Sequence, residues 1–536
     1  MPSNTPTPPP PASAPPPNNA RAPKPAKAPL GQPQVPNSLA PLPAKEFGLA
    51  HARHLLWRAG FGGSPEQIKL LADWGPEKSV EYLVQFDRAP GGIDEGSPEP
   101  FDKDIMRPAT QEERQMQRRA ASARDEETLA MIRTRRQEAE RKDREQIQSI
   151  RRWWLKRMIE TGRPLEEKLT LFWHGLLATS YRTIEDSYHM YRQNQLFRKH
   201  AAGNYGELLR ALIRDPAMLA YLDQNDSRKN KPNENLAREL MELFSLGVGN
   251  YTEQDIKEGA RALTGFTFVD DEFRFQTSNH DTGVKNILGR RGPLDGDGFV
   301  EAILDTPECS RYMARRLYRY FVADYPTGRA PIDRAAEGVM HEMASDLSRN
   351  RYELRPVLRK VFLSRHFYDR RIMCEQIKSP VELVVGAIRS LNLPARDLQT
   401  LLEAMNMMGQ AIMFPPSVKG WEGGRSWINT STMFVRQNTL VYMLTGKRPQ
   451  GRDALADEEK FDAGVLESRL AAIDPRVKSA SPDERLDAVL EFAVGRTDLA
   501  GRSAAREFLA SRGEMNAGTL ADLLLLVTAM PEYQLC

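Results

Sequence analysis

The stretch PNENLARELMELFSLGVGNYTEQD, residues 232–255, carries the clearest structural signal in the chain. A proline and two asparagines precede a run with helical periodicity, and glycines end it. At about 100° per residue, the apolar side chains fall on one side of the predicted helix. The opposite side carries Glu234, Asn235, Arg238, Glu239, Glu242 and Ser245. This pattern predicts an amphipathic helix that packs through its apolar face.

The polar face of this helix has two interpretations. Glu234, Arg238 and Glu242 are spaced four residues apart, so an exposed face would form two consecutive ion pairs, each contributing about 0.3 kcal/mol. A face buried against a second element would instead supply carboxylates for general acid/base chemistry or for ligand binding. One cap residue is enough to start a helix, so the pair Asn233 and Asn235 is more than a purely solvated helix requires.

Helix-start signals recur along the chain and predict a predominantly all-α fold. Each combines a short polar cap with a proline at the first helical position, where its missing N–H has no cost. They are SPEQ at 64–67, DPAM at 215–218, TPEC at 306–309, SPVE at 379–382 and SPDE at 481–484. Gln67, Glu382 and Glu484 complete capping-box patterns, and Thr252 is a further predicted cap.

One segment departs from the helical pattern. FTFVDDEFRFQ, residues 266–276, alternates phenylalanines on both sides of an Asp-Asp turn, which predicts a small β-hairpin at about 266–275 with one aromatic face. The loop that follows carries His280, Asp281 and Lys285. Polar residues in loops are less constrained by packing, so these three are candidates for a functional role in which Asp281 orients His280 or accepts from Lys285. The alternative is a turn with a surface ion pair.

Composition divides the chain into five segments. Residues 1–45 are a proline-rich, low-complexity tail that is expected to be disordered. Residues 46–102 are an N-terminal helical segment, and residues 103–152 are a long charged helix that Trp153 and Trp154 should anchor to the core. Residues 153–440 are the main helical body with the candidate site, and residues 441–536 are a C-terminal helical segment. The tail and the charged helix are the candidate docking elements for a protein partner.

Composition also bears on several functional classes. With 40% hydrophobic residues, the 536-residue chain can build a sizeable core, and a net charge of +3 argues against a dedicated nucleic-acid-binding protein. Three scattered cysteines predict neither a disulfide framework nor a metal site. No apolar run approaches the roughly 20 residues of a membrane span, and no signal peptide is recognisable in the sequence as given. Motifs for phosphate, dinucleotide or zinc chemistry are also missing, so the cofactor stays unknown.

Two further stretches supply candidate site residues. His174 lies in the apolar helical run FWHGLL, where a histidine is either a hydrogen-bonded core residue or part of a site. Residues 414–438, FPPSVKGWEGGRSWINTSTMFVRQN, combine prolines and glycines with Trp421, Arg425 and Trp427, and then enter a helix with Arg436. Rigid aromatic loops of this kind line pockets for flat or sugar-like ligands, and the alternative is a packed connector.

Seven motifs in order resemble the bacterial domain-of-unknown-function 1800 family. They are HLLWRAGFGGSPEQI, FWHGLLATS, DPAMLAYLD, PNENLARELMELFSLGVGNYTEQDIKEGARALTGF, HDTGVKNILG, FPPSVKGWEGGRSWIN and the terminal PEYQ. The resemblance covers the chain from about His51 onward, except for the charged segment, and implies a largely helical protein of a family with many exported members. Family members commonly read FWH, any residue, then HF; this chain has Gly175 and Leu176 there, so a paired-histidine site is not implied.

Together these features predict one polar pocket suited to general acid/base hydrolysis without a metal. Glu234 or Glu239 would act as acid or base, Arg238 would orient it, and His280 with Asp281 would carry the second proton. The substrate-binding residues would be Asn233, Asn235, His174, Lys285, Trp421, Arg425, Trp427 and Arg436. The alternative function is a non-catalytic scaffold or partner-binding protein in which these polar motifs are structural.

Overall fold

The computed structural model describes residues 34–88, 98–99, 101–447, 460–479 and 481–536. Residues 35–536 form one compact unit, which is described here. The predicted tail lies outside the described ranges up to residue 33, and residues 448–459 of the predicted C-terminal segment also lie outside them. The compact unit begins before the boundary expected at residue 45, because Val35, Leu39 and Leu42 are buried and Pro41 forms an antiparallel bridge with Ser364.

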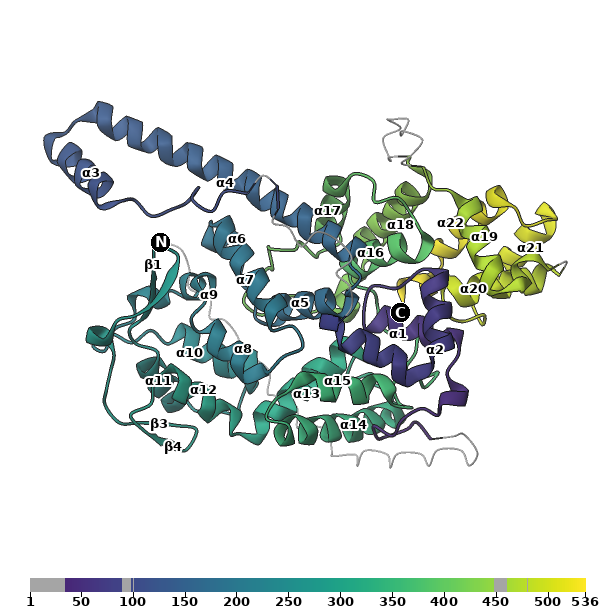
Figure 1. Ribbon diagram of the computed structural model, residues 1–536, viewed down its shortest axis with the longest axis horizontal. Helices are drawn as coiled ribbons and strands as arrows, with labels where there is room; N and C mark the ends of the chain where they lie inside the picture. Colours follow the sequence, from purple (N-terminus) through teal and green to yellow (C-terminus); the bar gives the residue numbers. More distant parts are fainter. Residues whose placement is uncertain (1–33, 89–97, 100, 448–459, 480) are drawn as a thin grey trace, which may run out of the picture. The chain divides into compact units, whose positions relative to one another are not determined.

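The prediction of a predominantly α-helical fold is confirmed: the described residues contain 22 α-helices and four short strands (Figure 1). The helices of the first half are α1 (Leu49–Arg58), α2 (Pro65–Val84), α3 (Gln111–Ala123), α4 (Glu126–Glu160), α5 (Pro164–Leu176), α6 (Tyr181–Ile184), α7 (Ser187–Lys199), α8 (Tyr205–Leu212), α9 (Pro216–Tyr221), α10 (Asn235–Glu239) and α11 (Glu253–Ala262). Those of the second half are α12 (Gly296–Leu304), α13 (Pro307–Phe321), α14 (Ala330–Arg349), α15 (Leu354–Leu363), α16 (Pro380–Leu391), α17 (Leu398–Met407), α18 (Thr430–Thr445), α19 (Ala463–Ile473), α20 (Pro482–Ala493), α21 (Arg502–Arg512) and α22 (Ala517–Ala529).

The predicted caps explain where many of these helices begin. Ser64, Thr252 and Ser379 each form a capping box with the residue three positions on. Asp215 and Ser481 accept a backbone N–H of α9 and α20 in the same way. Thr306 is the exception, because its hydroxyl donates back to the Ile303 carbonyl and leaves the start of α13 without a side-chain cap.

The charged segment forms two helices, so the prediction of one long helix is corrected. Arg124 adopts a left-handed conformation (φ 56°) that ends α3, and Asp125 then accepts the Thr128 N–H and caps α4. The two helices pack against each other and are joined by an ion pair of 2.7 Å between Arg135 and Glu113. Trp154, near the end of α4, is fully buried, as expected for the anchor of this segment.

The predicted hairpin is present. β1 (Phe266–Val269) pairs antiparallel with β2 (Glu272–Phe275), in a register that sets Phe266 opposite Phe275 and Phe268 opposite Phe273. Asp270 and Asp271 both have positive φ, as the tight turn between the strands requires. A second, unpredicted hairpin joins β3 (Lys285–Ile287) to β4 (Arg290–Gly292).

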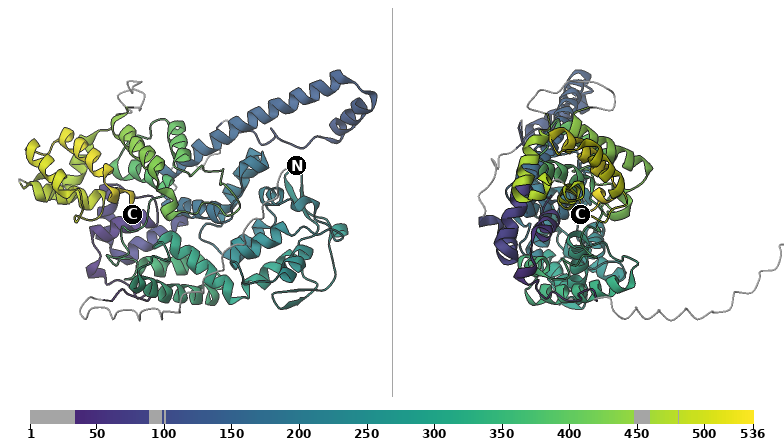
Figure 2. Two further views of the ribbon diagram at one scale, coloured as in Figure 1. Left: turned by 180° about the vertical axis from the view of Figure 1, so that it is seen from behind. Right: turned by 90° about the vertical axis from the view of Figure 1, so that its right-hand side faces the viewer.

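The first and last helices of the compact unit share a core. Arg53 on α1 donates to the carbonyls of Phe492 and Ala493 at the end of α20, at 2.6 and 2.8 Å. Helix α2 packs against α15 and α19, and Figures 1 and 2 show the purple N-terminal helices beside them from both sides. The segments expected at 46–102 and 441–536 therefore contribute to one hydrophobic interior. No helix in the described ranges has the length and apolar character that a bilayer crossing demands.

Helices α5 and α16 are buried along nearly their whole length and carry charged residues that are paired inside the protein. Glu167 accepts from the Trp154 indole at 2.9 Å and from Arg198 at 2.7 Å. Lys168 on α5 forms an ion pair with Glu382 in the first turn of α16. Burial alone would raise the pKa of Glu382, but Lys168 and Arg58 outweigh it and lower that pKa to about 2.

Candidate functional site

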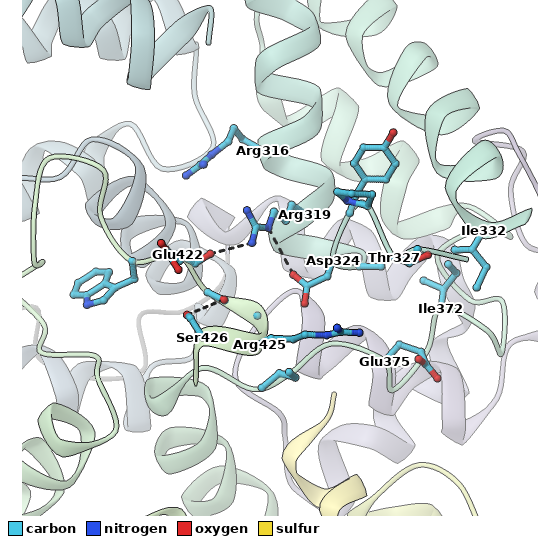
Figure 3. A pocket seen from close by; sticks show the side chains of 18 of the residues that line it. Arg316, Arg319, Asp324, Thr327, Ile332, Ile372, Glu375, Glu422, Arg425 and Ser426 are labelled. Atoms are coloured by element: carbon cyan, nitrogen blue, oxygen red, sulfur yellow. Dashed lines mark hydrogen bonds and ion pairs between the residues drawn. The ribbon is translucent and has the colours of Figure 1, made fainter. Parts of the chain in front are cut away.

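A cavity of about 1240 Å³ lies between the end of α13, the segments that follow it and the loop before α18 (Figure 3). One wall comes from α13 and residues 323–332, and a second comes from residues 371–377. The loop at 419–426 closes the opposite side, and Leu176 and Leu243 supply apolar lining. Leu176 occupies the position where the family resemblance implies a second histidine.

The lining of this cavity is rich in cations. It contains Arg316, Arg319, Arg329, Arg371, Lys419 and Arg425, against the carboxylates Asp324, Glu375 and Glu422. Six cations against three carboxylates leave a local charge of +3. A cleft with one sign of charge focuses the electrostatic potential and concentrates counter-ions.

Three of the six cations are held by carboxylates. Arg319 lies 3.7 Å from Asp324 and donates to the Glu422 carbonyl at 3.0 Å. Arg329 pairs with Glu375 at 3.0 Å. Arg371 is held at 2.7 Å by Asp369, next to the cavity. These contacts fix the positions of the side chains that form the wall.

The other three cations are available to a ligand. Within the described ranges, the side chains of Arg316, Lys419 and Arg425 make no hydrogen bond or ion pair, although Arg316 lies 6.0 Å from the centre of the Tyr312 ring. Arg316 is half-buried, whereas Lys419 and Arg425 are exposed. Figure 3 shows Arg316 and Arg425 reaching the cavity from different elements.

Glycines allow the 419–426 loop to approach its neighbours closely. Gly420 has φ 69°, and a Cβ there would lie 2.0 Å from the Gly175 carbonyl oxygen of α5. Gly424 has φ 57°, and its Cβ would lie 2.8 Å from an Asp324 carboxylate oxygen. Close docking of the loop on α5 therefore depends on Gly420 and sets the position of the next residue, Trp421.

The cavity adjoins an inner chamber of about 120 Å³ at the start of α16. Its walls include Phe172, Trp421 and Trp427, and its polar groups include Gln376, Glu382 and Gln410. Arg316, Arg319 and Trp421 line both spaces, so the chamber adjoins the main cavity.

The predicted site residues lie in several places. Trp421 and Arg425 line the cavity, and Trp427 lines the chamber. His174 lies behind Trp421, with ring centres 5.5 Å apart, and its Nε2 accepts the Met413 backbone N–H at 3.0 Å. Burial lowers the pKa of His174 to about 3, so the imidazole is neutral. Its two contacts, with Met413 and with Trp421, hold the segment that precedes α18.

The Glu234–Arg238–Glu242 row is only half formed, which corrects the expectation of two consecutive pairs. Arg238 pairs with Glu234 at 3.2 Å, but its second partner is Glu253 at 2.9 Å. Glu242 instead accepts the Tyr251 hydroxyl. The reason is a π-helical segment, Leu240–Ser245, which adds a residue to the turn and rotates Glu242 away from Arg238.

The rest of this stretch caps the helix and approaches the cavity. Asn233 donates to the Asp223 carbonyl at 2.8 Å and accepts the Asn235 N–H at 2.9 Å, while Asn235 itself is exposed. Glu239 is half-buried, and burial followed by repulsion from Glu242 raises its pKa. Lys419 of the cavity lining opposes that shift electrostatically, but Glu239 is not itself among the residues that line the cavity.

His280, Asp281 and Lys285 gather next to α11 and are not among the residues that line the cavity. His280 Nδ1 lies 2.8 Å from the Thr264 carbonyl. The Asp281 carboxylate binds Arg261 through two contacts of 2.8 and 3.1 Å. Lys285 is buried and donates to the Asp281 carbonyl, so Asp281 meets it through the backbone, not through its carboxylate.

Arg436 is fully buried in α18. It donates to the Gln534 side chain at 3.0 Å and to the Lys378 carbonyl at 2.7 Å. Burial lowers the pKa of Arg436 to about 10. These contacts tie α18 to the C-terminal residues.

A metal-capable group of residues lies apart from the cavity. Asp186, His189 and Asp271 bring ligand atoms within 4.8 Å of one another. Burial alone would lower the pKa of His189, but Asp271, 2.8 Å from its Nε2, and Asp186 outweigh burial and raise it. His189 therefore lies between two carboxylates and joins α7 to the hairpin turn.

The arrangement defines a class: an α-helical protein with a basic, aromatic-walled cavity. The chain belongs to the family described as "Protein of unknown function (DUF1800)", whose model matches residues 54–535. That range includes every residue of the cavity lining. No protein with a curated description and no solved structure matches the chain.

Proposed function

We propose that this protein binds an anionic ligand in the basic cavity. The observation that carries the proposal is the set of Arg316, Lys419 and Arg425, which line one cavity without an ion-pair partner in the described ranges. Guanidinium groups bind carboxylate, phosphate and sulfate through charge-assisted hydrogen bonds. The paired arginines form the wall of the cavity, and the unpaired cations bind the ligand.

Calorimetric titration with citrate and with inorganic tripolyphosphate tests this proposal. We expect both anions to bind with 1:1 stoichiometry and with affinity that falls as KCl is added, because salt screens the charges. Arg425→Gln should weaken binding about tenfold or more, since a hydrogen bond to a charged group contributes about 1.5–3 kcal/mol. Arg118→Gln, at an exposed position on α3, is the matched control and should change nothing. Unaltered affinity in Arg425→Gln, or no binding by the wild type, would contradict the proposal.

A second candidate function is general acid/base hydrolysis of the bound ligand. It is favoured by Glu239, a half-buried carboxyl with a raised pKa that makes no hydrogen bond through its side chain in the described ranges. A carboxyl with a raised pKa is suited to donate a proton near neutral pH. The electrostatic influence of Lys419 on the Glu239 pKa supports a role near the proposed ligand.

The hydrolytic role predicts a specific outcome for Glu239→Gln. This variant should keep the tripolyphosphate affinity of the wild type and lose at least about 100-fold in turnover, which is the usual contribution of a positioned acid or base. Release of nitrophenol from ester, phosphate and glycoside substrates measures turnover. If the wild type binds the anions but releases no nitrophenol, the hydrolytic role is contradicted and the anion-binding proposal stands.

The scaffold alternative receives support at the predicted residues outside the cavity. Asn233, His174 and His280 each make hydrogen bonds with the backbone, which fits a role in holding loops and helix ends. Docking of a protein partner by the α3–α4 pair remains a prediction.

A further inference from the structure

Two glutamines that line the inner chamber each leave one side-chain atom without a hydrogen-bond partner among the described residues. Gln410 is 5% exposed; its Oε1 accepts the Val381 N–H at 3.0 Å, and its Nε2 has no partner among the described residues. Gln376 donates through Nε2 to the Arg319 carbonyl at 3.0 Å, and its Oε1 is buried without a partner. A buried polar group left unpaired costs about 1–3 kcal/mol, so such groups call for an occupant.

A hydroxyl group is complementary to each of these atoms. It is the simplest neutral group that donates and accepts, as the free Gln376 oxygen and the free Gln410 amide require. A chamber of about 120 Å³ is several times what one ordered water needs. Phe172, Trp421 and Trp427 add flat apolar walls against which the carbon face of a ring can pack.

The distribution of positive charge distinguishes among anionic ligands. Arg316 belongs to α13, while Lys419 and Arg425 belong to the loop before α18, so the unpaired cations are spread around a cavity of about 1240 Å³. A nucleotide concentrates its charge at one end, in its phosphate chain, which proteins usually bind with a glycine-rich loop at a helix N-terminus. Dispersed cations suit a chain that carries one charge on each unit.

We propose that the inner chamber binds one sugar ring, and that the ligand of the cavity is an acidic saccharide. The hydroxyl groups of this ring pair with Gln376 and Gln410, and Trp421 packs against its face. Carboxylates on the neighbouring units meet Arg316, Lys419 and Arg425 in the main cavity. This inference rests on the proposed anion-binding function and adds the class of ligand.

Titration with a short oligogalacturonate, and with its fully methyl-esterified neutral form, tests this inference. The acidic form should bind at least tenfold more tightly than citrate, and the esterified form should lose most of that affinity. Gln376→Leu and Gln410→Leu should each remove the advantage over citrate while leaving tripolyphosphate binding within twofold. Gln254→Leu, exposed on α11, is the matched control, and melting temperatures verify that the variants fold.

The outcomes separate the two proposals. If tripolyphosphate binds in a salt-dependent manner but the oligogalacturonate binds no more tightly than citrate, the sugar chamber is overturned and the anion site stands. If ATP binds more tightly than the oligogalacturonate, the saccharide is overturned in favour of a nucleotide. If no anion binds, both proposals fail. Two independent glutamine variants guard against the misfolding of one.

Discussion

Replacing Lys168 with methionine is expected to lower the free energy of unfolding by about 3–5 kcal/mol at pH 7, the usual result of breaking a buried ion pair. Lys168 and Glu382 join α5 to α16 in the interior, and the lysine side chain is fully buried. The variant leaves the Glu382 carboxylate buried and without that partner. Urea unfolding measures the loss, and Lys142→Met, at a 57% exposed side chain on α4, should change stability by less than about 1 kcal/mol.

The pH dependence of this loss follows from the depressed pKa of Glu382. With a folded-state pKa of about 2 against an ordinary 4.5, the carboxylate stabilises the wild type fully above pH 4.5, and this contribution is lost as the pH falls toward 2. Without Lys168, burial raises the pKa of Glu382, and the carboxyl protonates at a higher pH. The loss of unfolding free energy caused by Lys168→Met should therefore become smaller as the pH falls from 7 to 4. A deficit that is the same at both values would contradict the ion-pair explanation.

Neutralising all three unpaired cations, as Arg316→Gln, Lys419→Gln and Arg425→Gln together, is expected to weaken tripolyphosphate binding by at least about 100-fold. Each charge-assisted contact contributes about 1.5–3 kcal/mol, and every 1.4 kcal/mol is a factor of ten. None of the three side chains has an ion-pair partner in the described ranges, so replacing them leaves no carboxylate without its partner. The melting temperature should therefore stay within a few degrees of the wild type.

The control for this variant removes the same charge elsewhere. Arg114, Arg118 and Arg119 are exposed on α3, and their joint replacement by glutamine also changes the net charge by minus three. Binding should then fall only by the modest amount expected from the long-range field. Equal losses in the two triple variants would mean that overall charge, and not the cavity, attracts the anion.

Much of the helical framework could be predicted from local chemistry. Caps such as Ser64 and Ser379 act within four residues, so the sequence predicts where their helices begin. The break between α3 and α4 at Arg124 could not be predicted, because the charged run contains no proline or glycine there. Within so many charged residues, the pattern does not distinguish Asp125 as a helix cap. The π-helical turn after Glu239 left no local signal, and it redirected Glu242.

The candidate site was harder to predict, because its wall comes from distant parts of the chain. Trp421 and Arg425 stood out, since prolines and glycines around them indicate a shaped loop. Arg316 lies in an ordinary helix, and only the packing of α13 against that loop turns it into cavity lining. Periodicity also fails to distinguish His280, held by a backbone carbonyl, from a histidine in a site.

Anomalous diffraction from crystals soaked in selenate tests the central claim most directly, because the ion reports where anions bind. We expect a selenium peak inside the cavity, within hydrogen-bond distance of Arg316, Lys419 or Arg425. Its occupancy should fall when tripolyphosphate is added, because both anions use the same cations. Selenate at other arginines of the surface, with the cavity free of any peak, would contradict the claim that this cavity binds anions.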